Sequence, residues 1–359
     1  MKQKMMSDFH ESLFEVNLNY LKENIQFFKK RLKPKTKIIA VVKAHAYGHG
    51  DIEISKELEK NNIDALWVAD FEEGVVLRKN NIKIPIIVAN ASPKSVSQII
   101  KYNLDVVVYN FRMLDELIKI KQKINIHLKF NCGMNRFGFS VNDIINIKSK
   151  TNNVKSTNII SICSHLSSSG DSNSDKQSLL ELEKFKQISE CFPDVKYKHV
   201  LSTSGVIRFS DHQYSAVRIG IGLYGIYNDQ NLKQIGRLTS TISQVRVIEK
   251  NEIIGYRGIF KSNKKMRIGV VPFGYADGLD RKLGNSNGSL FVDGIRCEIL
   301  GEISMDSCVI NLNNTTAKEG DRVEIIGDTN NIHSICEKAK SIPYEFLSKI
   351  NRRIKRVYN

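Results

Sequence analysis

The sequence predicts an α/β protein in which an N-terminal (β/α)8 TIM-like barrel is followed by a C-terminal, mostly-β domain. Its 359 residues suffice for one barrel-sized core and a second, smaller core. Apolar residues make up 41% and charged residues 26% of the chain, which excludes disordered and fibrous classes. Short β-branched runs alternate with helical patterns over the first two thirds, and this rhythm ends near residue 235.

Eight short runs have the pattern of parallel barrel strands. Most are almost continuously apolar, as expected for a strand covered on both faces. Eight strands alternating with helices are typical of a (β/α)8 barrel. The expected strands are Lys37–Val42, Asp64–Ala69, Ile84–Ala89, Asp105–Tyr109, Ile124–Phe130, Asn158–Cys163, Tyr197–Leu201 and Ser215–Ile219.

Three helices of this part can be placed from their patterns. Asp51 is a candidate N-cap for a helix through Lys60, and Asp175–Cys191 has an apolar face. Another helix is expected before the first strand, where apolar residues recur at helical spacing. These residues are Leu18, Leu21, Ile25, Phe28 and Leu32.

The last third of the chain reads as a β domain, so we expect domains at 1–235 and 236–359. The turn signals Asn287-Gly288 and Asp293-Gly294 separate some of its strands, and helical character returns only near Ser341–Lys349. The expected strands are Thr239–Ile248, Met266–Val271, Ser289–Val292, Arg296–Leu300, Ser307–Leu312 and Arg322–Ile326.

The chain is basic, with 54 lysines and arginines against 38 acidic residues and a formal net charge of +16. This balance allows anionic small molecules, nucleic acids or acidic surfaces as partners without selecting one. The basic residues are spread along the chain, and neither an RNA-binding motif nor a zinc-binding spacing accompanies them. We therefore interpret them as a solvated surface and expect no nucleic acid and no bound metal.

The cysteines and the N-terminus indicate a cytoplasmic protein. Six cysteines occur without a CxxC pair, which predicts reduced and mostly buried thiols. Met1–Val16 contains Lys2 and Lys4 but no apolar segment, so we expect no secretory signal. No run approaches the ~20 apolar residues of a membrane helix, so we expect no membrane association.

In a barrel, reacting groups gather where strands end and loops begin, and Lys43 directly follows the first expected strand. By position alone an ordinary strand-end lysine is the better interpretation. The small, glycine-bearing loop that follows favours function, because a bulky ligand can approach it closely.

Two cations mark the end of the fifth expected strand. Lys129 lies in an apolar stretch, where an unpaired charge is costly, so it needs a partner or a modification. Arg136 follows in a glycine-flanked loop and offers a planar fork to an oxyanion, although a solvated rim arginine is an equal alternative.

Small polar residues follow the last three barrel strands. His165 comes after the sixth; a lone histidine is more often structural, but this position makes it a candidate. Ser202–Gly205 and Arg218–Gly222 bring hydroxyls and bare amides to the ends of the seventh and eighth strands, the usual phosphate cradle of barrels. Together with Lys43, they suggest a phosphorylated aldehyde cofactor held as a Schiff base.

The β domain contributes two glycine-bearing turns, Phe273–Gly278, which contains Tyr275, and Gly301–Asp306. Each is by itself best interpreted as an ordinary turn.

Taken together, the motifs resemble those of alanine racemase, a fold-type III family dependent on pyridoxal 5′-phosphate. Val42–Gly50 is similar to its cofactor-lysine motif and Gly133–Gly138 to its glycine-methionine-x-arginine loop. Gly274–Gly278 is similar to the catalytic tyrosine motif, Ser304–Asp306 to the substrate-contacting motif and Arg353–Tyr358 to the C-terminal tyrosine segment. The matches follow the family's order and include both domains.

The resemblance implies an isomerase that interconverts L- and D-alanine, a small-molecule substrate, and supplies D-alanine for cell-wall peptidoglycan. Lys43 would form the internal aldimine with pyridoxal 5′-phosphate and act as one base. Tyr275 of the partner subunit would be the opposite base in a homodimer with shared active sites. Two bases on opposite faces can remove a Cα proton from one side and return it to the other without turning the substrate over.

The resemblance also implies roles for the remaining motif residues. Arg218 would contact the pyridine nitrogen, and His165 would pack near the ring. Arg136 and the Met305 backbone would bind the substrate carboxylate, with Met305 coming from the partner. Lys129 corresponds to a lysine that is often carbamylated in the family. The phosphate contacts would be Tyr47, Ser204, Gly220, Ile221 and Tyr358.

The chain departs from the family's common residues at five positions, so its substrate range stays open. Serine or another small amino acid is an alternative substrate, and a fold-type III decarboxylase is an alternative enzyme. A vitamin-B6 carrier would lack the β domain, and a nucleic-acid binder is supported by the net charge alone. The departures are His45, Asn131, Cys132, Glu302 and Lys355.

Overall fold

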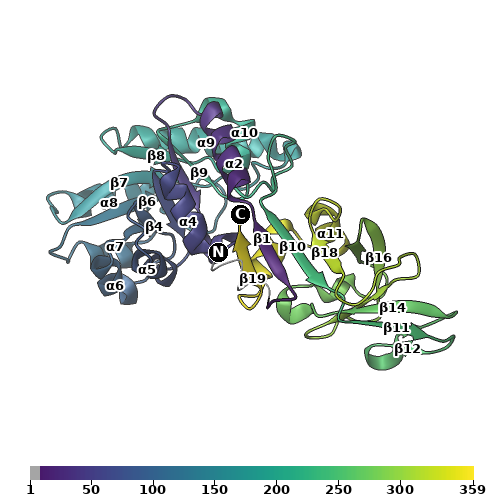
Figure 1. Cartoon of the computed structure of the whole chain (residues 1–359). Coiled ribbons are helices and arrows are strands. Elements are labelled where there is room, and N and C mark those ends of the chain that lie inside the picture. Colours follow the sequence, from purple (N-terminus) through teal and green to yellow (C-terminus); the bar gives the residue numbers. More distant parts are fainter. Residues whose placement is uncertain (1–8) are drawn as a thin grey trace. The chain divides into compact units, whose positions relative to one another are not determined.

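A computed structural model describes residues 9–359, which form two compact units (Figure 1). The barrel unit comprises Lys22–Ala46 and Asp51–Leu232. The C-terminal unit comprises Lys233–Asn359 together with Tyr47–Gly50 and the described residues up to Leu21. Two short segments from the first 50 residues therefore pack with the C-terminal part. The predicted division at residue 235 is a single cut in the sequence and assigns both segments to the barrel.

Two expectations concern the N-terminus and the membrane. The stretch for which we expect no secretory signal begins with residues 1–8, which lie outside the described residues. Among residues 9–359, no helix combines the length and the apolarity that crossing a bilayer requires.

The eight predicted barrel strands are confirmed, all parallel, in a sheet of order β8-β7-β6-β5-β4-β3-β2-β9. The two end strands approach each other, and Arg218 N on one donates to Leu201 O, just beyond the other, at 3.0 Å. The strands are β2 (Lys37–Val41), β3 (Ala65–Val68), β4 (Ile86–Val88), β5 (Asp105–Val108), β6 (Ile124–Lys129), β7 (Thr157–Cys163), β8 (Tyr197–His199) and β9 (Ala216–Ile219).

Helices follow the strands as the alternating pattern predicts, and the three placed from sequence, α2, α4 and α9, are confirmed. Short polar residues begin two of the others: Asp70 accepts a hydrogen bond from Glu72 N, and Asn110 accepts one from Met113 N. The helices are α2 (Leu18–Arg31), α4 (Asp51–Lys60), α5 (Phe71–Lys79), α6 (Val96–Lys101), α7 (Phe111–Leu117), α8 (Ile144–Thr151), α9 (Asp175–Glu190) and α10 (Thr203–Arg208).

The C-terminal unit is built on a nine-stranded sheet of order β11-β14-β17-β16-β15-β18-β10-β1-β19. Figure 1 shows β1, near the N-terminus, between β10 and β19; β1 runs antiparallel to the former and parallel to the latter. The strands are β1 (Leu13–Val16), β10 (Gly236–Thr241), β11 (Gln244–Ile248), β14 (Met266–Val271), β15 (Ser289–Val292), β16 (Ile295–Leu300), β17 (Cys308–Asn311), β18 (Arg322–Ile326) and β19 (Lys355–Tyr358). A separate hairpin joins β12 (Ile253–Ile254) and β13 (Phe260–Lys261).

The structure corrects three expectations for this unit. The run Thr239–Ile248 is two strands, because β10 and β11 pair with different neighbours. Strands β1 and β19 were not expected, since four residues are too few for a clear alternation. Helical character is not confined to the end of the chain: α11 (Ile332–Lys338) precedes the expected helix, which is α12 (Pro343–Lys349).

The segment after β2, α3 (Lys43–Tyr47), is a turn of left-handed helix built without glycine. Left-handed backbone costs a non-glycine residue about 1–2 kcal/mol, so the surrounding structure must hold this turn in place. The values of φ are 52° for Ala44, 56° for His45, 52° for Ala46 and 51° for Tyr47.

The residues that follow this turn are fixed within the C-terminal unit. Arg356 Nε donates to Gly48 O at 2.9 Å, and Tyr358 Oη donates to His49 O at 3.1 Å. Gly48 has a φ of +82°, and a Cβ there would lie 2.1 Å from Leu347 O. Only glycine satisfies both conditions.

We expect Gly48→Ala to destabilise the protein by about 2–5 kcal/mol, because left-handed strain and a backbone clash add. Gly294→Ala is the matched control: its φ is +78°, and nothing lies within 4 Å of the added Cβ. It should cost only about 1–2 kcal/mol. Unfolding midpoints of the two variants and the parent protein test this, and equal losses would contradict it.

Candidate active site

Five predicted site residues gather at one end of the barrel unit. Lys43 follows β2, Lys129 ends β6 and Arg136 lies in the next loop, while His165 follows β7 and Arg218 is on β9. Each of the four cations affects the pKa of His165, which burial lowers first and Arg218, Lys129, Arg136 and Lys43 lower further. The end of the barrel therefore has a concentrated positive charge.

Lys43 is adapted to lose its proton. Although the residue is exposed as a whole, partial burial of its ammonium and then Arg136 lower its pKa. Glu73 opposes this effect and Arg218 adds to it. Both carboxylate oxygens of Glu73 accept backbone hydrogen bonds, one from Ala44 N and one from Ala69 N, each at 2.7 Å. Because burial and the two arginines lower the pKa of Lys43, its neutral amine, the nucleophilic form, is easier to reach than in an ordinary lysine.

Lys129 is half-buried, and no carboxylate among residues 9–359 forms an ion pair with it. Burial lowers its pKa to about 8, with Arg218, Arg136 and Lys43 contributing and the Cys163 thiol opposing. Lys129, Arg136 and His165 line one small cavity. The predicted need for a partner or a modification is therefore not met by another residue of the described chain.

Arg218 is 5% exposed and is held by neutral acceptors. Its terminal nitrogens donate to the carbonyl oxygens of Ser164, His199 and Val200, and to Nδ1 of both His165 and His199. Because a guanidinium can only donate, both histidines must be unprotonated at Nδ1. Among the described residues nothing bonds to Arg218 Nε, which leaves one donor for a ligand.

A buried chain of hydrogen bonds leads away from Arg218, with one residue from each of five successive strands. His199 Nε2 is 3.2 Å from Ser161 Oγ, which is 2.7 Å from His127 Nδ1. His127 Nε2 is 3.3 Å from Asp105 Oδ2. Because Arg218 donates to His199 Nδ1, the proton of His199 lies on Nε2 and is donated to Ser161. Ser161 then donates to His127, and His127 donates to the carboxylate of Asp105. Sequence analysis missed these four residues; the signal was polar side chains inside apolar strands.

The hydroxyls predicted to hold a phosphate lie near the turn that follows β9. Thr203 Oγ1 accepts hydrogen bonds from Gly220 N at 3.2 Å and Gly222 N at 3.3 Å. Ser204 Oγ is 2.7 Å from Ser169 Oγ. The predicted residues Ser204, Gly220 and Ile221 are thus brought together through Thr203, which sequence analysis did not single out.

Tyr47 and Tyr358 belong to the C-terminal unit. The Tyr47 ring centroid is 5.9 Å from that of Tyr344, and burial raises the pKa of Tyr47, which keeps its phenol protonated. Tyr358 Oη packs against Gly50, where an added Cβ would lie 1.8 Å from it.

The turns of Tyr275 and Met305 pair through their backbones in the same unit. Tyr275 N donates to Ser304 O and Ala276 N to Met305 O, each at 3.0 Å. A Cβ on Gly274 would lie 2.3 Å from Met305 O, so the glycine permits this approach. The residues Tyr275 and Met305 are 41% and 53% exposed.

Glu302 pairs with two arginines, of which Arg281 lies beside Tyr275. It forms ion pairs with Arg257 and, at 3.2 Å, with Arg281, and the Arg281 guanidinium lies 5.9 Å from the Tyr275 ring centroid. The hydrogen bond from Arg257 is the largest cause that lowers the pKa of Glu302. Glu302 thus reduces the positive charge next to Tyr275.

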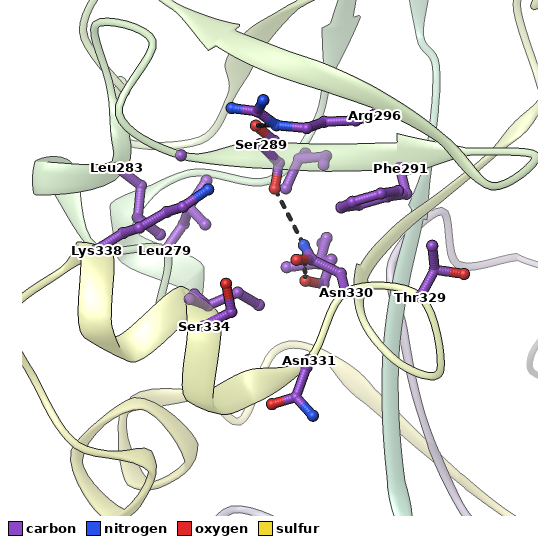
Figure 2. A pocket seen from close by; sticks show the side chains of 14 residues that line it. Leu279, Leu283, Ser289, Phe291, Arg296, Thr329, Asn330, Asn331, Ser334 and Lys338 are labelled. Atoms are coloured by element: carbon purple, nitrogen blue, oxygen red, sulfur yellow. Dashed lines mark hydrogen bonds between the residues drawn. The ribbon is translucent and has the colours of Figure 1, made fainter.

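A larger cavity of about 340 Å³ lies elsewhere in the C-terminal unit (Figure 2). Arg296 and Lys338 are its basic residues, and Asn330 crosses it to bond Ser289 O at 3.0 Å. No predicted site residue lines it, so cavity size does not locate the predicted chemistry.

Comparison with known proteins decides the family. The model of the alanine racemase N-terminal domain matches residues 16–228, and that of the C-terminal domain matches residues 235–358. An alanine racemase from Clostridium kluyveri is 32% identical over 96% of this chain and 93% of its own length. The chain belongs to the alanine racemase family.

Solved structures of the family agree over the whole chain. Alanine racemase from Clostridium difficile 630 has a TM-score of 0.92 and 28% identity, covering 97% of this chain and 96% of its own. Alanine racemase from Bartonella henselae with covalently bound pyridoxal phosphate has a TM-score of 0.88 and 25% identity, covering 97% and 99%. The predicted fold class, family and isomerase class are confirmed.

Besides Glu302, three residues at which this chain departs from the alanine racemase family have defined surroundings in the structure. Asn131 Oδ1 accepts hydrogen bonds from Gly133 N and Asn135 N, which an aspartate there could equally accept. Cys132 is buried, and burial raises its pKa to about 11. His45 Nδ1 lies 2.8 Å from Asp51 Oδ1. All six cysteines are free and five are buried, as predicted.

We expect Ser161→Ala to destabilise the protein by about 2–4 kcal/mol, because it leaves two buried histidine nitrogens without a partner. Ser178→Ala is the matched control: this serine is fully buried, and no described residue bonds to its hydroxyl. Its replacement should change stability by less than about 1 kcal/mol. Chemical unfolding of both variants measures the difference, and similar losses would refute the role of the chain.

Proposed function

We propose that this protein interconverts L- and D-alanine with pyridoxal 5′-phosphate as its cofactor and with Lys43 and Tyr275 as the two bases. The observation that carries the proposal is the lysine with a lowered pKa at the end of the first barrel strand, beside Arg136 and Arg218. In an alanine racemase family member, this is the arrangement that an amine nucleophile and base requires.

The residues present fit the cofactor. Its phosphate is anionic, and the end of the barrel concentrates cations. Its ring nitrogen accepts a hydrogen bond, and Arg218 Nε is a donor without a described partner. When bound, the cofactor supplies an aldehyde for the substrate's amino group and a ring that delocalises the electrons left by Cα proton loss. By the family resemblance, we assign its phosphate to Tyr47, Ser204, Gly220, Ile221 and Tyr358.

The protein's own residues then divide the work. Lys43 and Tyr275 exchange the Cα proton on opposite faces, and His165 packs against the ring. Arg136 and the Met305 backbone hold the substrate carboxylate. Arg218 stays protonated and only donates, so it does not pass a proton to the ring nitrogen.

We further propose a homodimer in which each site takes Tyr275 and Met305 from the partner, and a role in supplying D-alanine for peptidoglycan. The exposure of both side chains supports the shared site, because a side chain that serves another subunit must project from its own.

Two inactive variants test the shared site. Lys43→Ala and Tyr275→Phe should each lose racemisation of alanine, followed by optical rotation. After verified subunit exchange, the mixture should recover about a quarter of the parent activity, since half of the dimers are mixed and each has one intact site. A mixture that stays inactive would refute the shared site. The same assay with serine and other small amino acids reports the preferred substrate.

Lys129 is proposed to be carbamylated. Its amine would bond the carbon of CO2 and release a proton, which gives Arg136 an anionic partner. A pKa of about 8 leaves much of the amine neutral and reactive near that pH.

With 13C-labelled bicarbonate, a carbamate carbon signal should appear in the parent protein and vanish in Lys129→Ala. Lys123→Ala, at an exposed lysine of the same region, should retain it. A signal that persists in Lys129→Ala, or none in the parent, would count against the modification.

A further inference from the structure

Asp277 closes the turn that carries Tyr275. This turn is the short helix η6 (Tyr275–Asp277), followed by Gly278 in the left-handed region at φ +118°. Asp277 is 3% exposed, and its Oδ2 accepts a hydrogen bond from Gly274 N at 2.9 Å. The turn has only a few backbone bonds of its own, among them Asp277 N to Gly274 O at 3.1 Å and Gly278 N to Tyr275 O at 3.2 Å, and this carboxylate adds a side-chain bond that closes it.

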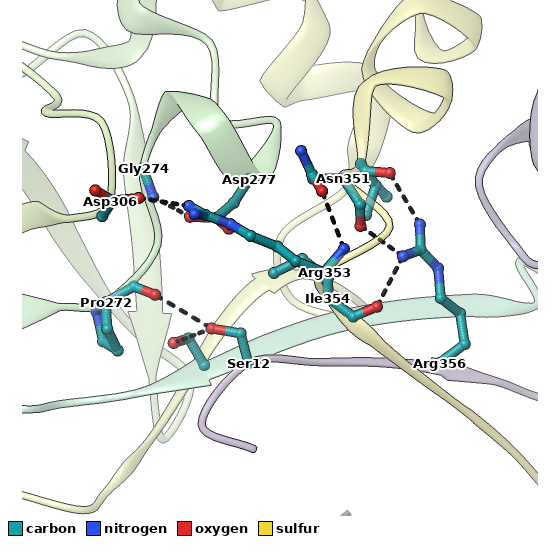
Figure 3. Close-up of polar contacts among 11 residues, drawn as sticks. Ser12, Pro272, Gly274, Asp277, Asp306, Asn351, Arg353, Ile354 and Arg356 are labelled. Atoms are coloured by element: carbon teal, nitrogen blue, oxygen red, sulfur yellow. Dashed lines mark hydrogen bonds and ion pairs between the residues drawn. The ribbon is translucent and has the colours of Figure 1, made fainter.

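Arg353 connects that carboxylate to the turn of Met305. Its Nε donates to Asp277 Oδ1 and its Nη2 to Asp306 Oδ1, each at 2.6 Å (Figure 3). Asp306 directly follows Met305 in the chain. One planar guanidinium therefore bonds one carboxylate from each of the two paired turns.

The backbone of Arg353 is fixed against the same turn. Asn351 N donates to Asp277 O at 3.1 Å, and Asn351 Oδ1 accepts from Arg353 N at 3.0 Å. Arg356 donates to three carbonyl oxygens of the segment 350–354, which Figure 3 shows beside Arg353. The guanidinium is thus held in place before any ligand binds.

We propose that Arg353 is a positioning residue that fixes Tyr275 and Met305 relative to each other by bridging Asp277 and Asp306. The inference rests on the proposed function, in which Tyr275 is a base and the Met305 backbone binds the substrate carboxylate. Arg353 acts through the two turns and is bonded to neither residue.

The effects of losing Arg353 on stability and on the rate have different causes, which distinguishes positioning from support of the fold. The Arg353–Asp306 ion pair is exposed on both sides, and such pairs contribute little to folding. The pair with the buried Asp277 contributes more, because its loss leaves a buried carboxylate with fewer partners. A displacement of about 1 Å at a reacting group, in contrast, can lower a rate by about 100-fold. Losing the bridge should therefore lower turnover as well as stability, and only the loss of turnover reports positioning.

The test compares Arg353→Ala with Arg352→Ala, which removes the same charge from the exposed neighbouring residue. Arg353→Ala should lower kcat for alanine racemisation by roughly 10- to 100-fold, and Arg352→Ala by less than about twofold. Arg353→Lys should be intermediate, because an ammonium does not form a planar bridge. Hydrogen exchange of the peptide containing the Tyr275 and Ala276 amides should accelerate in Arg353→Ala only.

Tyr275→Phe, measured alongside, separates the two claims. If it keeps full activity, the proposed function fails. If it is inactive while Arg353→Ala keeps the parent kcat, KM and exchange rates, the positioning role is overturned; a lower unfolding midpoint with unchanged kinetics overturns it as well.

If Arg353→Ala does not fold, Asp306→Ala decides, because this carboxylate is exposed and alanine cannot accept the bond from Arg353 Nη2. It should raise KM with a smaller change in kcat, since only the Met305 turn is released. Unchanged KM and exchange would overturn the role.

Discussion

A buried guanidinium that has no counter-ion among residues 9–359 sets the properties of the barrel site. Taking an ionised group out of water is costly unless hydrogen bonds replace its hydration, and carbonyl oxygens and histidine nitrogens do so for Arg218. Neutral acceptors leave the charge uncancelled. The charge then helps to lower the pKa of Lys43, Lys129 and His165, and a site of this kind favours an anionic ligand.

The same constraint explains why a barrel core contains so many polar groups. His199 must accept from Arg218, so its other nitrogen needs an acceptor, which Ser161 supplies. Ser161 in turn donates to His127, and the sequence of donors ends only at Asp105, which needs no further donation. Successive parallel strands bring one residue each, because their side chains lie in layers across the barrel. A fully satisfied chain of this kind fixes one tautomer of each histidine.

The barrel strands could be predicted because a strand that is buried on both faces has a nearly continuous apolar sequence. Strands β1 and β19 could not, since each is four residues long and depends on a partner more than 200 residues away in the chain. Lys43, Arg136 and Tyr275 were found from short motifs. Their supporting residues were not: Arg353 contacts Asp277 across 76 residues of sequence, and His127 was not singled out within its strand. Motifs point to the groups proposed to contact a substrate, whereas the groups that support them are recognised only from the partners they have in the structure.

Arg356 is a second buried arginine whose guanidinium donates to carbonyl oxygens. It is 7% exposed, and burial lowers its pKa to about 10. All three of its nitrogens donate to carbonyl oxygens, including that of Gly48 beside the left-handed turn. Arg218 uses the same kinds of bond but leaves Nε without a described partner. Similar burial and similar acceptors therefore give a cross-link in Arg356, whereas Arg218 keeps one donor without a described partner, the donor that the proposed function assigns to a ligand.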